Sequence, residues 1–175
     1  MDRNKVVLVD ENDSALGEMN KLEAHKKGKL HRAFSVFIFN YNNEMLLHQR
    51  ADKKYHGGGL WTNACCSHPQ MDEKIIASAS ERLYFEMGLE CELTKLFSFV
   101  YKKAVENDLI EHEFDHVFIG FTNESPKPNN DEVKTYKWAD EPEWLQSDIK
   151  SNPNSYTSWF KMALPKVLVH LKETV

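Results

Sequence analysis

The chain lacks the features that mark membrane and secreted proteins. Its longest apolar runs, such as Val36–Phe39, are far shorter than the roughly 20 residues that a membrane-spanning helix needs. Residues 1–5 show no apolar stretch and cleavage site of the kind that a signal peptide carries. The sequence has only three cysteines, two of them adjacent, which make a poor disulfide framework. We therefore expect a cytoplasmic protein that works in a reducing compartment and does not bind membranes.

The chain also lacks an excess of positive charge. Lys and Arg number 22 against 27 Asp and Glu, which gives a formal net charge of −5 at pH 7. General nucleic-acid binding depends on a basic surface, so this balance argues against a nucleic-acid partner. A small anionic substrate stays compatible with it, provided that its basic contacts are local.

Internal repeats, low-complexity tracts and linkers are missing as well. The 175 residues, of which 41% are hydrophobic and 28% charged, are enough to bury a substantial core. We expect residues 1–175 to form one domain and favour a monomer.

Strand patterns outnumber helix patterns along the chain. Strands are predicted at residues 6–9, 31–40, 45–47, 96–105, 109–121 and 133–138. The turn signal Asn40–Asn43 predicts a hairpin between the second and third of them. Helices are predicted at residues 73–87, ending before Gly88, and at residues 159–171, with an interruption at Pro165. This order favours an α+β fold in which two helices flank a sheet.

Two segments combine residue types that perform acid–base chemistry. They are Trp61-Thr62-Asn63-Ala64-Cys65-Cys66-Ser67-His68-Pro69-Gln70 and Glu111-His112-Glu113. Side chains alternate along an extended chain, so Cys66 and His68 share one face, and Glu111 and Glu113 share another. Cys65 then faces away. A buried, inert thiol is the alternative for either cysteine, whereas a nearby metal or basic group would favour the thiolate.

The histidines and acids together offer nitrogen and oxygen ligands for a metal. The set is His25, His31, His68, Glu111 and Glu113. Two acids on one strand face repel each other unless a positive charge lies between them. Three imidazoles and two carboxylates suit a five- or six-coordinate Mn²⁺, Mg²⁺ or Zn²⁺ better than a tetrahedral structural zinc. The alternative is an exposed strand face whose acids are balanced by lysines.

The loop at residues 53–59 joins basic residues to consecutive glycines. Arg50, Lys53 and Lys54 lie in or beside it. Point charges next to a flexible backbone suit a cradle for a diphosphate, although a solvated basic loop has the same composition.

Three further residues have two interpretations each. Glu86 follows Arg82 by four residues on the predicted helix, a spacing that fits an ordinary ion pair as well as a site. Tyr101 and Trp159 suit the core, but an aromatic face also stabilises a cation.

In combination and in order, these motifs resemble the type I isopentenyl diphosphate isomerases. The resemblance spans about residues 18–165. Its anchors are Ala24-His25, Leu30-His31, Ala33-Phe34, Trp61-Thr62-Asn63, Cys66, His68-Pro69-Gln70, Tyr84, Glu86, Gly88, Glu111, Glu113 and Asn130-Asp131-Glu132-Val133. It implies a Nudix-like mixed β-sheet flanked by helices and an enzyme of isoprenoid biosynthesis. The implied reaction is the metal-assisted interconversion of isopentenyl and dimethylallyl diphosphate.

The resemblance also implies a role for each candidate. Cys66 and Glu113 would flank the alkene as the two acid–base groups around a tertiary carbocation, and Tyr101 would assist proton delivery. The metal ligands would be His25, His31, His68, Glu111 and Glu113. A second ion, Mg²⁺, would join Glu86 to the diphosphate. The remaining substrate contacts would be Lys21, Arg50, Lys54 and Arg82 at the diphosphate and Trp159 at the cation.

The chain departs from the acidic helix motif of the Nudix hydrolases. Aligned on Gly88, it keeps Glu86 but has Phe85 where the first glutamate of a pair is expected. Most of the carboxylates with which a hydrolase holds its metal are therefore absent. Relative to the isomerases, Cys65 is an additional thiol, and residues 55–59 are richer in glycine than the usual aromatic-Pro-Gly. A Nudix-type diphosphate hydrolase and a non-enzymatic metal-binding module remain the alternatives.

Overall fold

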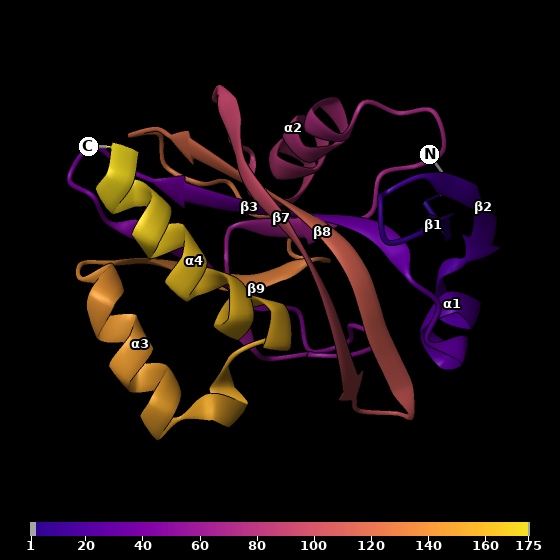
Figure 1. The fold of residues 1–175 in the computed structure, drawn as a ribbon. Coiled ribbons are helices and arrows are strands. Elements are labelled where there is room, and N and C mark those ends of the chain that lie inside the picture. Colours follow the sequence, from indigo (N-terminus) through magenta and orange to yellow (C-terminus); the bar gives the residue numbers. More distant parts are fainter. Residues whose placement is uncertain (1–2, 175) are drawn as a thin grey trace.

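One mixed sheet organises the computed structural model, which describes residues 3–174 (Figure 1). Its nine strands in this range are β1 (Lys5–Val9), β2 (Ala15–Asn20), β3 (His31–Phe39), β4 (Met45–Arg50), β5 (Trp61–Thr62), β6 (Cys65–Ser67), β7 (Leu93–Val105), β8 (Leu109–Phe121) and β9 (Val133–Ala139). The central strand β3 pairs antiparallel with β6 and parallel with β8, which itself forms a long hairpin with β7. The sheet therefore holds β6 and β8, the two segments with acid–base residues, on either side of β3.

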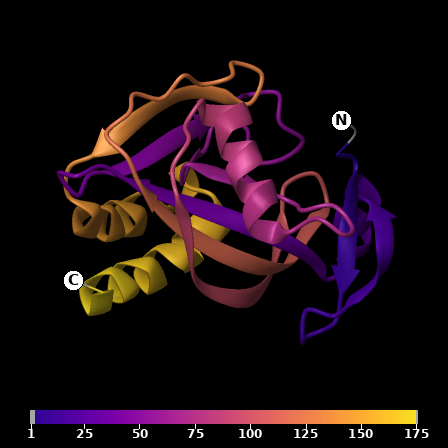
Figure 2. The same ribbon diagram turned by 90° about the horizontal axis from the view of Figure 1, so that it is seen from above.

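Helices cover both faces of this sheet (Figures 1 and 2). They are α1 (Lys21–Lys27), α2 (Ile75–Met87), α3 (Pro142–Ser151) and α4 (Ser158–Thr174), with a 3-10 turn at Pro153–Ser155. The sequence predicted two flanking helices, which correspond to α2 and α4; α1 and α3 are additional. Together these elements form a single domain, and no helix in the described part of the chain is long and apolar enough to cross a membrane.

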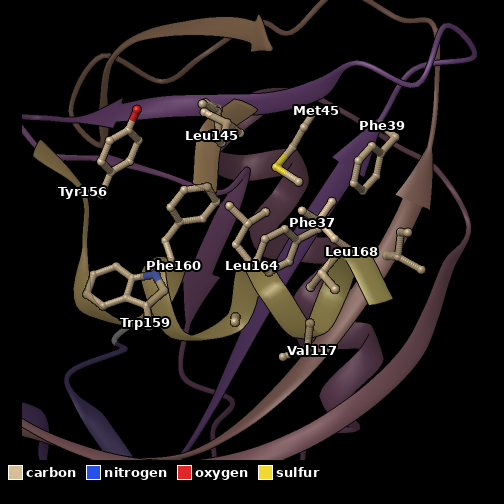
Figure 3. Close-up of a cluster of buried hydrophobic side chains, with 14 of the residues drawn as sticks. Phe37, Phe39, Met45, Val117, Leu145, Tyr156, Trp159, Phe160, Leu164 and Leu168 are labelled. Atoms are coloured by element: carbon tan, nitrogen blue, oxygen red, sulfur yellow. The ribbon is translucent and has the colours of Figure 1, made fainter. Parts of the chain in front are cut away.

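Alternation along β3 supplies two hydrophobic clusters. Phe37 and Phe39 pack on one side with Phe160 and Leu164 of α4 (Figure 3). On the other side, Val36 and its even-numbered neighbours pack with residues of α2. Because both faces are covered, the strand reads as a continuous apolar run.

The C-terminal helix corrects one prediction. The sequence predicted an interruption at Pro165, but α4 continues through this residue to Thr174. Pro165 is on the exposed side of the helix, whereas Ala163, Leu164 and Val167 are fully buried. Water can replace the one helical hydrogen bond that a proline removes on the solvent side, and the buried face keeps the helix in place.

The predicted hairpin after β3 is correct at its turn but not along its length. β3 and β4 pair only at Phe39 and Met45, and β4 then pairs with β9 from Met45 to Arg50. The predicted helix at residues 73–87 begins two residues later, at Ile75, and its end at Met87 before Gly88 is as predicted. Strand partners depend on distant segments, which local turn signals do not specify.

Candidate active site

A cavity of about 180 Å³ lies where α1, α2, β6, β8 and the loop after β4 meet. Most of the residues singled out in the sequence as site candidates line it. They are Lys21, Arg50, Lys54, Cys66, His68, Arg82, Glu86, Glu111, Glu113 and Trp159. The cavity thus brings together residues that are up to 138 positions apart in the sequence.

Glu111 and Glu113, the carboxylate pair, are buried on the inner face of β8, with exposed fractions of 2% and 6%. Tyr101 lies on the neighbouring strand β7, directly opposite Glu113 of β8. Its hydroxyl donates a hydrogen bond to Glu113 and lies 3.2 Å from Oε2 of Glu111. The exposed, lysine-balanced strand face considered from the sequence is therefore wrong. Tyr101 stands behind the carboxylates and does not itself line the cavity.

Three histidines from three elements meet beside these carboxylates. Ligand nitrogens of His25, His31 and His68 all lie within 4.8 Å of one another. Nε2 of His68 is 3.0 Å from Oε2 of Glu113, and Nε2 of His31 is 3.6 Å from the same oxygen. The structure thus assembles all five residues of the predicted nitrogen and oxygen set.

The orientation of the histidines fits a cation. Nδ1 of His25 is 2.7 Å from the carbonyl oxygen of Lys21, and Nδ1 of His31 is 2.8 Å from that of Lys29. With Nδ1–H donating to a carbonyl, the lone pair of Nε2 is left for another partner. Both Nε2 atoms are buried without a hydrogen bond. Metal-bound histidines are oriented in this way by their other ring nitrogen.

Burial and mutual repulsion set the charge states of the pair. Burial, followed by the charge of Glu113, raises the pKa of Glu111 to about 8. Burial alone would also raise the pKa of Glu113, but the imidazoles of His31 and His68 hold it well below its usual range. Burial lowers the pKa of His25 to about 4 and that of His68 to about 3, so both are neutral at pH 7, the form that binds metals.

Four cationic side chains, which we term the basic wall, line another part of the cavity: Lys21, Arg50, Lys54 and Arg82. Burial and the charge of Lys54 lower the pKa of Lys21. Glu132 partly balances the wall through an ion pair with Lys54 and a 3.8 Å contact with Arg82. Such a concentration of partly or fully buried donors suits a diphosphate. Lys53, the other basic residue of the loop, is exposed instead and lies 3.6 Å from Asp131.

The adjacent cysteines face opposite ways, as alternation predicts. Sγ of Cys66 lines the cavity and lies 3.2 Å from Oδ1 of Asn63. Burial raises the pKa of the Cys66 thiol, which therefore keeps its proton at neutral pH. Cys65 packs in the hydrophobic cluster between β3 and α2, and its thiol donates to Oε2 of Glu86 at 2.7 Å. Neither cysteine is in a disulfide.

Trp159 and Glu86 reach the cavity from the two helices on opposite faces of the sheet. The indole of Trp159 lies under the guanidinium of Arg50, 5.1 Å from its centre. Glu86 is buried on α2, 3.4 Å from Arg82, and forms no three-ligand group with the histidines among the described residues. Glu86 is thus available for a role separate from the histidine cluster.

Several lining residues were not singled out in the sequence: Ser35, Tyr55, His56, Asp115 and Glu132. Asp115 shares the parity of the carboxylate pair, and this signal could have identified it. Glu132 lies inside a motif that the resemblance quoted. Tyr55 and His56 belong to an irregular loop, where periodicity gives no direction for a side chain.

Comparisons with known proteins agree with this geometry. A family model described as "NUDIX domain" matches residues 29–160. The isopentenyl-diphosphate Delta-isomerase of Pectobacterium atrosepticum is 47% identical over 167 residues, covering 95% of this chain and 93% of that protein. Isopentenyl-diphosphate Delta-isomerase 2 of Photorhabdus laumondii is 48% identical over 156 residues, covering 89% and 88%.

Solved structures show the same fold at low sequence identity. DR0079 from Deinococcus radiodurans superposes with a TM-score of 0.77 at 15% identity, covering 93% of this chain and 98% of that one. A MutT NUDIX hydrolase from Burkholderia pseudomallei gives 0.61 at 18% identity, covering 79% and 98%. At these identities the similarity establishes the architecture alone.

Proposed function

Because this chain belongs to the isopentenyl-diphosphate Delta-isomerases and carries their NUDIX domain, we propose that the cavity described above is where it interconverts isopentenyl and dimethylallyl diphosphate. The observation that carries this assignment is the composition of a single cavity. Cys66 and Glu113 line it together with the basic wall and the aromatic face of Trp159. A diphosphate and a short alkene need these two kinds of environment side by side.

Cys66 and Glu113 are the proposed acid–base groups. The reaction adds a proton to the terminal carbon of the alkene and removes another from the carbon on the opposite side of the branch. Strands β6 and β8 hold the two groups on opposite sides of β3. One group gives its proton while the other takes one, and the reverse reaction exchanges their roles. Tyr101, which donates to Glu113, would assist proton delivery and hold this carboxylate in position.

The walls of the cavity protect the intermediate. Loss of the alkene π electrons to a proton leaves a tertiary carbocation, which water would quench. Trp159 offers an aromatic face to this charge. The basic wall holds the diphosphate, and this remote contact orients a hydrocarbon that has no polar group of its own.

Two divalent cations complete the proposal. His25, His31, His68, Glu111 and Glu113 would hold a Mn²⁺, Mg²⁺ or Zn²⁺ ion, and Glu86 would hold the Mg²⁺ that joins the diphosphate. When bound, such ions neutralise the carboxylate pair and the diphosphate and strengthen a coordinated carboxylic acid as a proton donor.

The helix α2 argues against diphosphate hydrolysis. Glu86 is the acid of α2 that lines the cavity, whereas Glu81 is exposed and Phe85 stands where a further carboxylate would be needed. A hydrolase needs several carboxylates on this helix to hold its metals. The isomerase assignment therefore fits the side chains as well as the family.

We also propose the setting in which the enzyme works. Its three cysteines are free thiols, which suits a reducing cytoplasm. The net charge of −5 disfavours nucleic acid and anionic membrane surfaces as partners, and the reaction needs one substrate molecule in one cavity, which favours a monomer.

One incubation tests the proposed function. The protein, isopentenyl diphosphate and Mg²⁺ are combined in D₂O, and the products are followed by NMR and by phosphate release. We expect dimethylallyl diphosphate that carries deuterium, with no phosphate released. Phosphate release without isomerisation would indicate a hydrolase, and neither reaction by a metal-loaded protein would indicate a binding module.

A further inference from the structure

The loop after β4 places a fourth imidazole at the histidine cluster. His56 is buried, with an exposed fraction of 3%, and its Nε2 lies 2.9 Å from Oε1 of Glu111. Its ring centre is 5.7 Å from that of His25. His56 is absent from the ligand set that the resemblance implies, although it faces the same carboxylate pair.

His25 links two overlapping groups of ligand atoms. One group is His25, His31 and His68, and the other is His25, His56 and Glu111. Within each group the ligand atoms lie within 4.8 Å of one another. Bonds of about 2.1 Å place opposite ligands of one ion about 4.2 Å apart, so small side-chain movements suffice for either group to close on a cation. Nε2 of His25, the residue that both groups share, is buried without a hydrogen bond.

The loop backbone is built to hold His56 in this position. The carbonyl oxygen of His56 accepts a hydrogen bond from Nη2 of Arg50 at 3.0 Å, and the N–H of the next residue, Gly57, donates to Glu106. Gly57 has φ of +66°, which favours glycine, and a Cβ at Gly58 would lie 2.4 Å from the carbonyl oxygen of Asp52. The consecutive glycines therefore let the chain turn tightly directly after His56.

We propose that His56 is a further ligand of the histidine and glutamate site, which makes it a site of four imidazoles and two carboxylates. This inference rests on the metal site of the proposed function and names one more residue in it. Six donor groups match octahedral coordination. Imidazole-rich sites favour ions such as Zn²⁺, Co²⁺ or Mn²⁺ over Mg²⁺, whose preferred ligands are oxygens.

A ligand differs from a residue that only positions Glu111. A glutamine at position 56 can still donate a hydrogen bond to Glu111, but its amide is a poor ligand for a transition metal. His56→Gln therefore keeps the positioning role and removes the proposed bond. His112→Gln is the matched control, because His112 lies between Glu111 and Glu113 on β8 but contacts the carbonyl oxygen of Gly28 on the other face of the strand.

Co²⁺ titration of the metal-free full chain tests the proposal without reference to turnover. Visible absorption reports the ligands of Co²⁺, and calorimetry reports its affinity. We expect His56→Gln to weaken Co²⁺ binding at least tenfold and to change the absorption spectrum, with His112→Gln unchanged. His56→Ala should regain the wild-type spectrum when free imidazole is added.

X-ray absorption of Co²⁺ in the wild-type protein provides a count that needs no variant. We expect four imidazoles bound to the ion. Three imidazoles, or a His56→Gln protein with unchanged affinity and spectrum, would overturn the role of His56 and leave the five-residue site intact. Failure of the wild-type protein itself to bind Co²⁺ would overturn the five-residue site along with it.

Discussion

At the scale of single residues, the adjacent cysteines show how alternation separates two functions. The side chain of Cys66 faces the cavity. The side chain of Cys65 is on the opposite face of β6, where its thiol contacts Glu86 of α2. We expect Cys66→Ala to lower kcat by a factor of about 10²–10⁴, the usual loss when a general acid or base is removed. Circular dichroism and metal analysis should show an intact fold and unchanged metal content.

Cys65→Ala should leave kcat nearly unchanged but should not be silent. Its thiol donates to Glu86, and a hydrogen bond of this kind contributes about 0.5–1.5 kcal/mol. We therefore expect the Mg²⁺ concentration for half-maximal activity to rise by roughly 2- to 10-fold, with Cys65→Ser close to wild type. Lost turnover in Cys65→Ala, together with activity in Cys66→Ala, would reverse the face assignment.

Substitution of Glu113 on β8 and of Glu86 on α2 should impair the enzyme in different ways. Glu113 is assigned to proton transfer on carbon, so Glu113→Gln should lower kcat. Glu86 is assigned to the ion at the diphosphate, so Glu86→Gln should raise KM, and added Mg²⁺ should partly restore it. An interaction present in ground and transition states changes KM, whereas one confined to the transition state changes kcat. Kinetics across a Mg²⁺ titration would distinguish them, and normal kcat for Glu113→Gln would refute its catalytic role.

Residue types and spacing predicted much of the site. Alternation placed Cys66 with His68 and Glu111 with Glu113, and the structure brings these side chains into one cluster. It could not identify His56, because the direction of that side chain depends on contacts of the loop with Arg50 and with Glu106, 50 residues further on.

At the scale of elements, local sequence patterns predicted which strands and helices form better than they predicted which strands pair. The long strand β8 has the predicted bounds, since its alternation and its flanking turn are both local features. The predicted pairing of β4 with β3 was wrong along most of its length. The main partner of β4 is β9, which lies more than 80 residues further along the chain, and only the folded sheet brings the two strands together.

β4 also carries a buried histidine that should make stability depend on pH. Burial, followed by the charge of Arg50, lowers the pKa of His48 from 6.5 to about 3. As pH falls below 6.5, the unfolded chain therefore takes up a proton at this residue while the folded chain does not. Between pH 7 and 5 this should cost roughly 1–2 kcal/mol of unfolding free energy.

His48→Gln should remove this contribution. The glutamine amide can still donate to the carbonyl oxygen of Ala64, which Nδ1 of His48 contacts at 2.9 Å. Urea unfolding at pH 7 and pH 5 would show a smaller loss of stability for the variant than for wild type, with His112→Gln as control. Equal losses in wild type and His48→Gln would show that His48 is not the source.

At the scale of the whole molecule, the same fold serves different chemistries. The MutT NUDIX hydrolase from Burkholderia pseudomallei shares the architecture at 18% identity. In this chain the proposed ligands of the histidine and glutamate site lie mainly on α1, β3 and β8, and a thiol and an indole line the cavity beside them. The reaction therefore follows from the side chains of the cavity and not from the sheet that carries them.

The separation of the proposed metal ligands from the core predicts what metal removal does. The two hydrophobic clusters, on opposite faces of the sheet, contain none of the six proposed ligands of the histidine and glutamate site. A chelator should therefore abolish turnover and leave far-UV circular dichroism and cooperative unfolding in place. The lost binding energy should lower Tm by roughly 5–15 °C. Added metal should restore both activity and Tm. A chain that loses its secondary structure in chelator at room temperature would instead need the ion to fold, as a metal-binding module does.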